Sequence, residues 1–400
     1  MNKFIISVFF FSLLTCKLDK KEKINNDPIK KYEVSFDTLK FLSPAIHYSS
    51  ASLFKVVNNS ILNDIEVMSI SNFINNTIQI YDFKKRKIYK TIQLHKDGPD
   101  RTLTGQFGFT HQIIPGNKIL VLDPLSYTFS VIDLNGHKIT SQRIPPDPNF
   151  EYAAAMEYSI QGVLHGDDFY YPAIPAHYAP LSNKDKLYDK LKHLIHYNTN
   201  TGFQLPKINR NNYYTLDLIY NTAQCCYANF VTSVNNKIFV SDCYQPDIKC
   251  YDARSYKYLY SIPAHSGYFY SAPSYDEHLS EQEYLFPPAE TYRSMERWGF
   301  VHPSYYQMYI DTINHSIIRQ AKLGMSDEPY YRDRTQYTSS FIFIDYDTNK
   351  IKGEALVKGG MIEKVAFFNG FITSEGLCFP FIDIQQNEDD HIYLVKAVFH

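Results

Sequence analysis

The chain has 400 residues, and its 40 Lys and Arg are set against 42 Asp and Glu, which gives a formal net charge of -2. This balance excludes a protein that is held to nucleic acid mainly by its overall charge. With 44% hydrophobic and only 20% charged residues, the chain is also not disordered, because it has enough apolar surface to build a core. The length allows one large domain or two to three ordinary ones.

Residues 1–15 have the pattern of an export signal. Lys3 supplies a positive start, and an apolar run from Phe4 to Leu14 follows, broken only by two serines. As a helix this run rises about 16 Å, which is too short to cross a hydrocarbon core of about 30 Å. Cys16 closes the run and resembles the cysteine of the bacterial lipoprotein box, whose thiol is diacylated and becomes the first residue of the mature chain. The resemblance predicts lipid attachment at Cys16; an ordinary signal peptide with an incidental cysteine is the alternative.

Residues 16–31 are predicted to be a lipidated tether. Positions 17 to 31 contain six Lys and three acidic residues with almost no apolar content, which is typical of a solvated linker. Two or three acyl chains hold a protein stably at a bilayer, so we expect a cell-envelope protein anchored to the outer membrane, on either its periplasmic or its surface face. Without Lys3 and this tether, residues 32–400 carry 33 basic and 39 acidic groups, a net charge of -6.

The strongest pattern in the remaining chain is an internal repeat. Three segments alternate like a strand and end in a polar turn, and in each case an Asp follows ten residues later, at the end of a second strand. The first strands and their acids are Val67–Asn72 with Asp82, Lys118–Asp123 with Asp133, and Lys237–Asp242 with Asp252. Less regular copies lie at 193–198 and 341–347, and 390–399 supplies the last strand. A unit of several strands that recurs along the chain predicts a β-propeller, whose blades bury their faces on one another.

The expected fold is therefore an all-β, six-bladed β-propeller that occupies residues 32–400 as a single domain. The C-terminal strand marks one blade and the hairpin acids mark five, namely Asp82, Asp133, Asn198, Asp252 and Asp347. Seven blades are the alternative, because the last two acids are far apart; we expect instead a long insertion at about 265–305, before blade five. The alternating segment Tyr32–Phe36 is expected to pair with the C-terminal strands, which removes open sheet edges.

Two further segments carry a resemblance to a known family. Lys96–Asp100 lies between the first two blades, and Tyr306–Asp311 is followed by Ile317–Arg319. With the lipoprotein start and the blade pattern, these segments resemble the domain-of-unknown-function 4221 family, six-bladed propeller lipoproteins of Bacteroides-type bacteria. In that family a tyrosine-rich strand of blade five reaches an Asp turn and returns through an Arg. The resemblance covers nearly the whole mature chain and implies a fold and a location. It implies no catalytic residues, since the family has no established activity.

Five cysteines follow Cys16. If Asn235 and Asn236 form a hairpin turn, two of these cysteines face each other across it, and a second turn separates the next pair. In an oxidising compartment a disulfide is possible among Cys226, Cys243 and Cys250, and buried free thiols are the alternative. No metal site is expected, because the paired spacing of zinc ribbons is absent.

The sequence contains none of the common catalytic or cofactor-binding motifs. No His-Glu-x-x-His, Gly-x-Ser-x-Gly, phosphate-binding loop or dinucleotide fingerprint occurs, so we expect no cofactor. His111 and Asp168 are weak candidates for an acid–base pair, if the fold brings them together. A hairpin turn is the structural alternative for Asp167 and Asp168.

The insertion at about 265–305 is the candidate binding surface, because it gathers aromatic residues with arginines. Tyr, Trp and Arg anchor binding hot spots, and exposed aromatic rings stack on sugars. Glu290–Trp298 is expected to form a short helix with two arginines on one face. The candidate ligand-binding residues are Tyr270, Tyr292, Arg293, Arg297 and Trp298. The alternative is that these aromatic residues seal a long loop onto the blades.

Together these features favour a non-enzymatic binding protein. It would be attached to the membrane by its N-terminal lipid and would bind a glycan, a peptide or an envelope protein through one propeller face, with no nucleic-acid partner. The alternative is a hydrolase or lyase that acts on polysaccharide at the propeller channel. A structural component of an envelope assembly is a third possibility.

Overall fold

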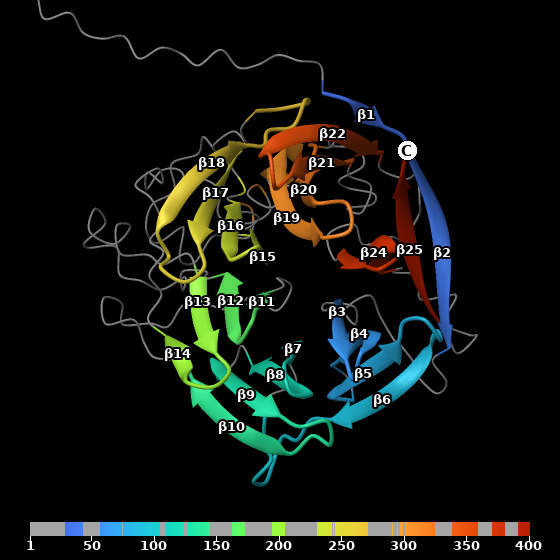
Figure 1. The fold of residues 1–400 in the computed structure, drawn as a ribbon. Helices are drawn as coiled ribbons and strands as arrows, with labels where there is room; N and C mark the ends of the chain where they lie inside the picture. The colour runs from blue at the N-terminus through green and yellow to red at the C-terminus, as the bar shows by residue number, and fades with distance from the viewer. Residues whose placement is uncertain are drawn as a thin grey trace, which may run out of the picture.

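The structure is a computed structural model in which the described residues are dominated by β-strands (Figure 1). The described residues are 29–42, 57–73, 75–104, 109–123, 126–144, 162–172, 194–204, 230–241, 243, 245–270, 290, 294, 297–298, 301–324, 338–358, 370–380 and 391–400. The fold class is all-β, as the sequence predicts. Within these ranges, no helix has the length and apolar character needed to span a membrane.

Three sheets have four strands each, and strands that are neighbours in space are also neighbours in sequence. One sheet contains β7 (Thr110–Ile114), β8 (Lys118–Asp123), β9 (Thr128–Ile132) and β10 (Lys138–Arg143). The next contains β11 (Val163–His165), β12 (Asp168–Pro172), β13 (Leu194–Asn198) and β14 (Gly202–Gln204). The third contains β15 (Phe230–Val234), β16 (Lys237–Ser241), β17 (Asp247–Asp252) and β18 (Tyr258–Pro263).

An eight-stranded sheet joins the two ends of the chain. One half contains β3 (Val57–Leu62), β4 (Ile65–Asn72), β5 (Thr77–Asp82) and β6 (Lys87–Gln93). The other half contains β23 (Phe371–Thr373), β24 (Gly376–Pro380), β25 (His391–Phe399) and β2 (Val34–Leu42). β2 pairs antiparallel with β25 along its whole length, as predicted for the N-terminal strand. The halves meet in one parallel pair, Leu42 with Lys87.

A five-stranded sheet completes the fold. It contains β19 (Ser304–Asp311), β20 (Ser316–Lys322), β21 (Ser339–Asp345), β22 (Lys350–Val357) and β1 (Lys31–Tyr32). β1 pairs parallel with β22, so that Tyr32 lies opposite Ala355. Tyr32 therefore belongs to this sheet, and the pairing with the C-terminal strand begins only at Val34.

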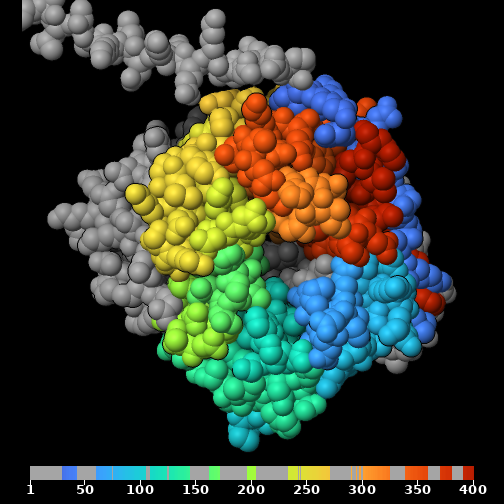
Figure 2. Space-filling view, viewed as in Figure 1, coloured from blue at the N-terminus to red at the C-terminus, as the bar shows by residue number. Residues whose placement is uncertain are grey.

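The sheets follow one another in chain order around a common centre, and the face in view is hollowed at that centre (Figures 1 and 2). The strands nearest the centre also contact one another from sheet to sheet. β15 contacts β11 and β19, β23 contacts β19 and β3, and β3 contacts β7.

The core lies between neighbouring sheets, which explains the almost continuous apolar runs of the repeat. On β8, Ile119 and Val121 pack against the sheet of β3 to β6, whereas Leu120 and Leu122 pack against the sheet of β11 to β14. Because successive side chains of a strand point to opposite faces, a strand that is buried on both faces needs apolar residues at every position.

A capped turn between the third and fourth strands of each repeat explains the recurring acid. The side-chain oxygen of the last strand residue, or of the residue after it, accepts backbone N–H groups from the turn, as Asx turns do. The capping residues are Asp82, Asp133, Asn198, Asp252 and Asp345. For the fifth unit the sequence pointed to Asp347; the residue that caps the turn is Asp345, and the hydrogen bond from Thr348 N–H lowers its pKa to about 2.

Candidate functional site

The structure describes only part of the residues that the sequence singled out. Four of them lie outside the described residues, namely Cys16, Tyr292, Arg293 and Cys226. The others can be placed, and the first two, His111 and Asp168, have different partners on different sheets.

His111 lies on β7 and is buried between two sheets, with 3% of its surface exposed. Its Nδ1 is 2.7 Å from Ser71 Oγ and its Nε2 is 2.8 Å from Ser69 Oγ, both on β4 of the neighbouring sheet. Burial lowers the pKa of His111 to about 3, so the ring is neutral at physiological pH. A neutral imidazole can donate to one hydroxyl and accept from the other. His111 therefore links two sheets and is poorly suited to act as a general acid.

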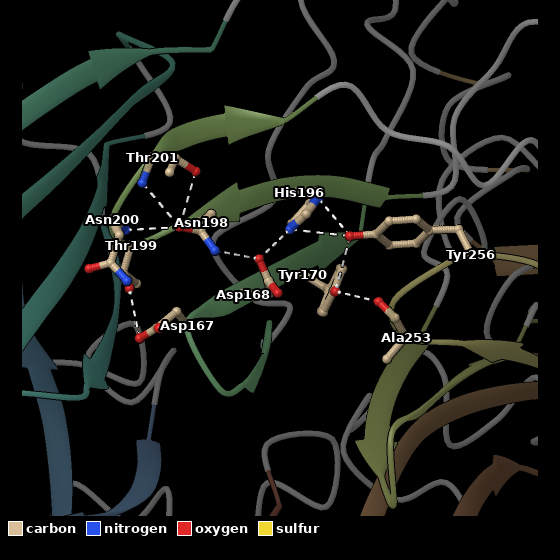
Figure 3. A network of polar contacts seen from close by, with 10 residues as sticks. All are labelled: Asp167, Asp168, Tyr170, His196, Asn198, Thr199, Asn200, Thr201, Ala253 and Tyr256. Carbon is tan, nitrogen blue, oxygen red and sulfur yellow. Dashed lines mark hydrogen bonds and ion pairs between the residues drawn. The ribbon is translucent and has the colours of Figure 1, made fainter.

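Asp168 begins β12 and lies beside two side chains of β13 (Figure 3). Its Oδ1 is 2.7 Å from His196 Nε2 and 2.7 Å from Asn198 Nδ2. His196 Nδ1 is 2.9 Å from the hydroxyl of Tyr256, in the β17–β18 turn of the next sheet. The Tyr256 hydroxyl is 3.3 Å from that of Tyr170 on β12. These contacts form one polar network that connects two sheets.

The order of groups in this network, carboxylate, imidazole and phenol, is that of a proton relay. Burial raises the pKa of Tyr256 and of Tyr170, and the Asp168 carboxylate adds to both increases. Both phenols therefore keep their protons at neutral pH and are weak bases and nucleophiles. Tyr170 is fully buried, and its ring stacks on His196 with centroids 4.9 Å apart. The network is suited to joining sheets rather than to transferring a proton to a substrate.

Arg319 of β20 connects the five-stranded sheet to the sheet of β15 to β18. It is fully buried, and its Nε donates to Ser241 Oγ at 2.9 Å. The Tyr305 ring centroid lies 3.6 Å from its Cζ, close enough for a cation–π contact. The guanidinium also donates to three backbone carbonyl oxygens at 2.6 to 2.9 Å, those of Gln245, Pro246 and Ala264.

Glu354 of β22 fixes the start of the insertion. Its buried carboxylate accepts hydrogen bonds from Ser266 Oγ at 2.6 Å and from Gly267 N–H at 2.9 Å, and another from Ser340 Oγ. The Tyr305 hydroxyl donates to the backbone oxygen of Tyr270 at 2.7 Å. Residues 266–270 are thus held by side chains from two strands of the five-stranded sheet, Glu354 of β22 and Tyr305 of β19.

The remaining candidates of the insertion divide between surface and core. Tyr270 exposes 56% of its surface, and Arg297 is also exposed. Trp298 is half-buried, packs against the hydrophobic cluster between the β15–β18 sheet and the five-stranded sheet, and stacks on His302 with ring centroids 4.6 Å apart. Arg297 and Trp298 are helical, as predicted. Trp298 therefore seals the insertion onto the sheets, whereas Tyr270 and Arg297 lie on the outside.

The cysteines that are described are buried and form no disulfide with one another: Cys243, Cys250 and Cys378. A disulfide between Cys243 and Cys250 is thus not formed, and Cys226 lies outside the described residues. Cys243 follows the end of β16, whereas Cys250 lies opposite Phe239 of β16 and Tyr260 of β18. Burial raises the pKa of Cys250, and it raises that of Cys378 to about 12, so neither thiol is readily ionised. Throughout the described ranges, no group of three or more His, Cys, Asp or Glu could hold a metal ion.

Comparison with known proteins shows a likeness in structure. No family model matches the chain, and no curated protein matches it. A solved structure of a DUF4221 family member from Bacteroides vulgatus aligns with a TM-score of 0.68 over 93% of this chain and 99% of its own, at 17% identity. A candidate exported protein of Bacteroides fragilis aligns with a TM-score of 0.52 over 92% of this chain and 99% of its own, at 12% identity. The likeness at these identities concerns the fold, and the chain has the fold of a DUF4221 family member, the family that its sequence resembles.

Proposed function

We propose that this chain is an exported, six-bladed β-propeller lipoprotein that binds a ligand without transforming it. Cys16 would carry the lipid and hold the protein in the cell envelope. The Bacteroides fragilis protein of similar fold is described as a candidate exported protein, which is consistent with this location. The ligand would be a glycan or a peptide, bound at the surface of the insertion.

The contacts between the innermost strands support a six-bladed ring. The three four-stranded sheets, the two halves of the eight-stranded sheet and the β19–β22 sheet make six units of four strands. The contacts of β3, β15 and β23 with their neighbours follow the order that a ring of six blades requires. The pairing of β2 with β25 places the N-terminal strand in the last unit, so that the first and last units meet.

One observation carries the choice of binding over catalysis. The acid–base candidates that the structure describes, His111 and the Asp168–His196 pair, are used in contacts that connect neighbouring sheets. In contrast, Tyr270 is held through its backbone by the Tyr305 hydroxyl while its ring faces outward. A fixed backbone with an exposed aromatic ring is what stacking on a sugar or a peptide side chain requires, because little entropy is lost on binding. The exposed Arg297 supplies a cation in the same insertion.

An array of glycans and peptides tests this proposal. We expect the intact protein to bind a small set of array members, and we expect the double variant Tyr270→Ala with Arg297→Ala to lose at least tenfold in affinity, as loss of one hot-spot pair would produce. Tyr258→Ala on β18 is the matched control, because that ring is 49% exposed but lies outside the insertion; it should bind normally. Equal binding by both variants would contradict the surface assignment.

A further inference from the structure

The predicted tether meets the folded protein at the start of the insertion. Lys30 and Lys31 end the tether, and Glu354 N–H of β22 donates to Lys30 O at 2.8 Å. A Cβ added to Gly267 would lie 3.7 Å from Ile29 Cδ1. The last tether residues therefore lie against both β22 and the backbone that leads to Tyr268, although more than 200 residues separate them in sequence.

Two lysines and one tyrosine are exposed at this place, and we name Lys30, Lys31 and Tyr268 the tether edge. Both lysines are exposed, and Tyr268 exposes 44% of its surface. Lys31 Nζ lies 5.2 Å from the Tyr268 ring centroid, so an ammonium group covers one face of the ring. Amphipathic tyrosine and lysine side chains are suited to the headgroup region of a bilayer, where lysine attracts anionic lipids.

The charge of the chain is distributed in a way that favours one orientation. Residues 32–400 carry a net charge of -6, whereas 17–31 carry six Lys and three acidic residues. An anionic membrane surface repels the body as a whole but attracts the basic segment that ends at the tether edge, and this attraction falls off within about 10 Å at 0.1 M salt.

We propose that the tether edge is a docking surface for anionic lipid headgroups, which turns this side of the protein toward the membrane. The inference rests on the proposed attachment at Cys16, which would place the lipid at the N-terminal end of this basic segment. Lys30 and Lys31 would approach the phosphates, and Tyr268 would lie at the level of the headgroups. The ligand-binding residue Tyr270 would then lie close to the membrane, beside the tether edge.

Vesicle sedimentation tests the docking surface in the absence of the lipid anchor. The probe is the mature chain with Cys16→Ala, produced without residues 1–15, which retains every residue that the structure describes. The vesicles are phosphatidylcholine alone, or phosphatidylcholine with roughly one third phosphatidylglycerol. We expect binding to the anionic vesicles only, and we expect it to be lost at about 1 M salt, where the Debye length is about 3 Å.

A matched pair of variants separates the tether edge from the rest of the tether. Lys31→Glu with Tyr268→Ser removes one lysine and one exposed tyrosine from the edge, and Lys257→Glu with Tyr258→Ser makes the same changes at the β17–β18 hairpin. Each lysine near an anionic surface contributes about fivefold in affinity, so the first variant should bind at least fivefold more weakly, and the second should change by less than twofold. Circular dichroism confirms that both are folded.

Two results of the vesicle experiment would overturn the proposed docking surface. Equal affinities for the two variants would overturn the docking surface and leave the other lysines of residues 17–31 as the groups that bind the lipid. Absence of binding to anionic vesicles by the parent would also overturn it. Attachment is measured independently by labelled-palmitate incorporation into the full chain. The parent should be labelled, and Cys16→Ala should abolish the labelling. A parent chain that does not incorporate palmitate would contradict the proposed anchor, whatever the vesicles show.

Discussion

His111 and Arg319 have the same structural role, but His111 is neutral whereas Arg319 is charged. Each is a buried basic residue that joins two neighbouring sheets, His111 through Ser69 and Ser71 and Arg319 through Ser241 and three backbone carbonyl groups. The difference lies in the acceptors. Carbonyl oxygens can only accept, so they require a donor such as guanidinium, which stays charged. Serine hydroxyls both donate and accept, so they accommodate a neutral imidazole whose pKa burial has lowered to about 3.

This comparison shows that a buried base need not be a catalytic residue. A strongly lowered histidine pKa in a cleft would suggest a functional site. Here the partners of His111 are side chains of the neighbouring sheet. Burial between the two sheets therefore accounts for the lowered pKa of His111 without a catalytic role. The Asp168–His196–Tyr256 network is a third contact of this type, between the next two sheets in the series.

The largest effect is expected from Arg319→Met. Methionine fills part of the volume but leaves the carbonyl oxygens of Gln245, Pro246 and Ala264 without the donor that the guanidinium supplies. Each buried acceptor that loses its donor costs about 1–3 kcal/mol. Pro246 O still accepts from Ala264 N–H, so losses at the other two carbonyl oxygens give about 2–6 kcal/mol. Urea unfolding followed by circular dichroism measures the change in the free energy of unfolding. Arg319→Lys should recover little of the lost stability, because lysine lacks the planar, forked donor geometry of guanidinium. An unchanged free energy of unfolding in the methionine variant would contradict the role of the hydrogen bonds.

An intermediate effect, confined to acid pH, is expected from His111. Its pKa is about 3 in the folded protein, against 6.5 as the ordinary value, so the unfolded chain binds more protons between these two values. Stability should therefore fall as the pH is lowered from about 6.5 toward 3, and no contribution is expected above 6.5. His111→Gln should flatten this part of the stability–pH curve. A stability–pH curve that is equally steep in the His111→Gln variant would refute the assignment.

The smallest effect is expected from Tyr256→Phe. The substitution removes the hydroxyl that contacts His196 Nδ1 at 2.9 Å and keeps the ring. Loss of one hydrogen bond of this kind costs about 1 kcal/mol, which urea unfolding can resolve when several replicates are compared. Tyr258→Phe, whose hydroxyl contacts Ser261 on the exposed surface, should cost less. If Tyr256→Phe lowered the free energy of unfolding as much as Arg319→Met, the hydrogen bond of Tyr256 and those of Arg319 would not differ as their burial suggests.

The sequence predicts most of the strands because the repeat combines two local signals. Residues 118–123 are apolar at almost every position, since β8 is buried on both faces, and an acid marks the turn that follows the next strand. The Asn235–Asn236 turn, which entered the cysteine argument only as a supposition, is present, and both residues have the positive φ that this hairpin needs. The sequence pointed to Asp347 as the capping residue of the fifth unit, whereas Asp345 caps the turn. Two acids in one turn cannot be told apart from the sequence, because the choice depends on where the backbone N–H groups lie.

The candidate site was predicted less well, because its contacts join distant parts of the chain. Asp168 was considered with His111, but it meets His196, 28 residues away, and through it Tyr256, a further 60 residues away. Neither spacing forms a motif. Arg319 was noticed only through a family resemblance, and Glu354, which fixes the start of the insertion, gave no signal in the sequence.

The sequence by itself determined the class of fold, the repeat and the basic segment that ends at Lys31, because periodicity, turn chemistry and charge are local properties. Only the tertiary structure decided which buried polar residues meet and which end of the chain lies beside the insertion. The physical reason is that hydrogen bonds such as those of Arg319 and Glu354 depend on the order in which the sheets pack around their common centre. A side-chain contact across more than 50 residues leaves no pattern in either segment, unlike the pairing of β2 with β25, which the alternation of the N-terminal strand predicted.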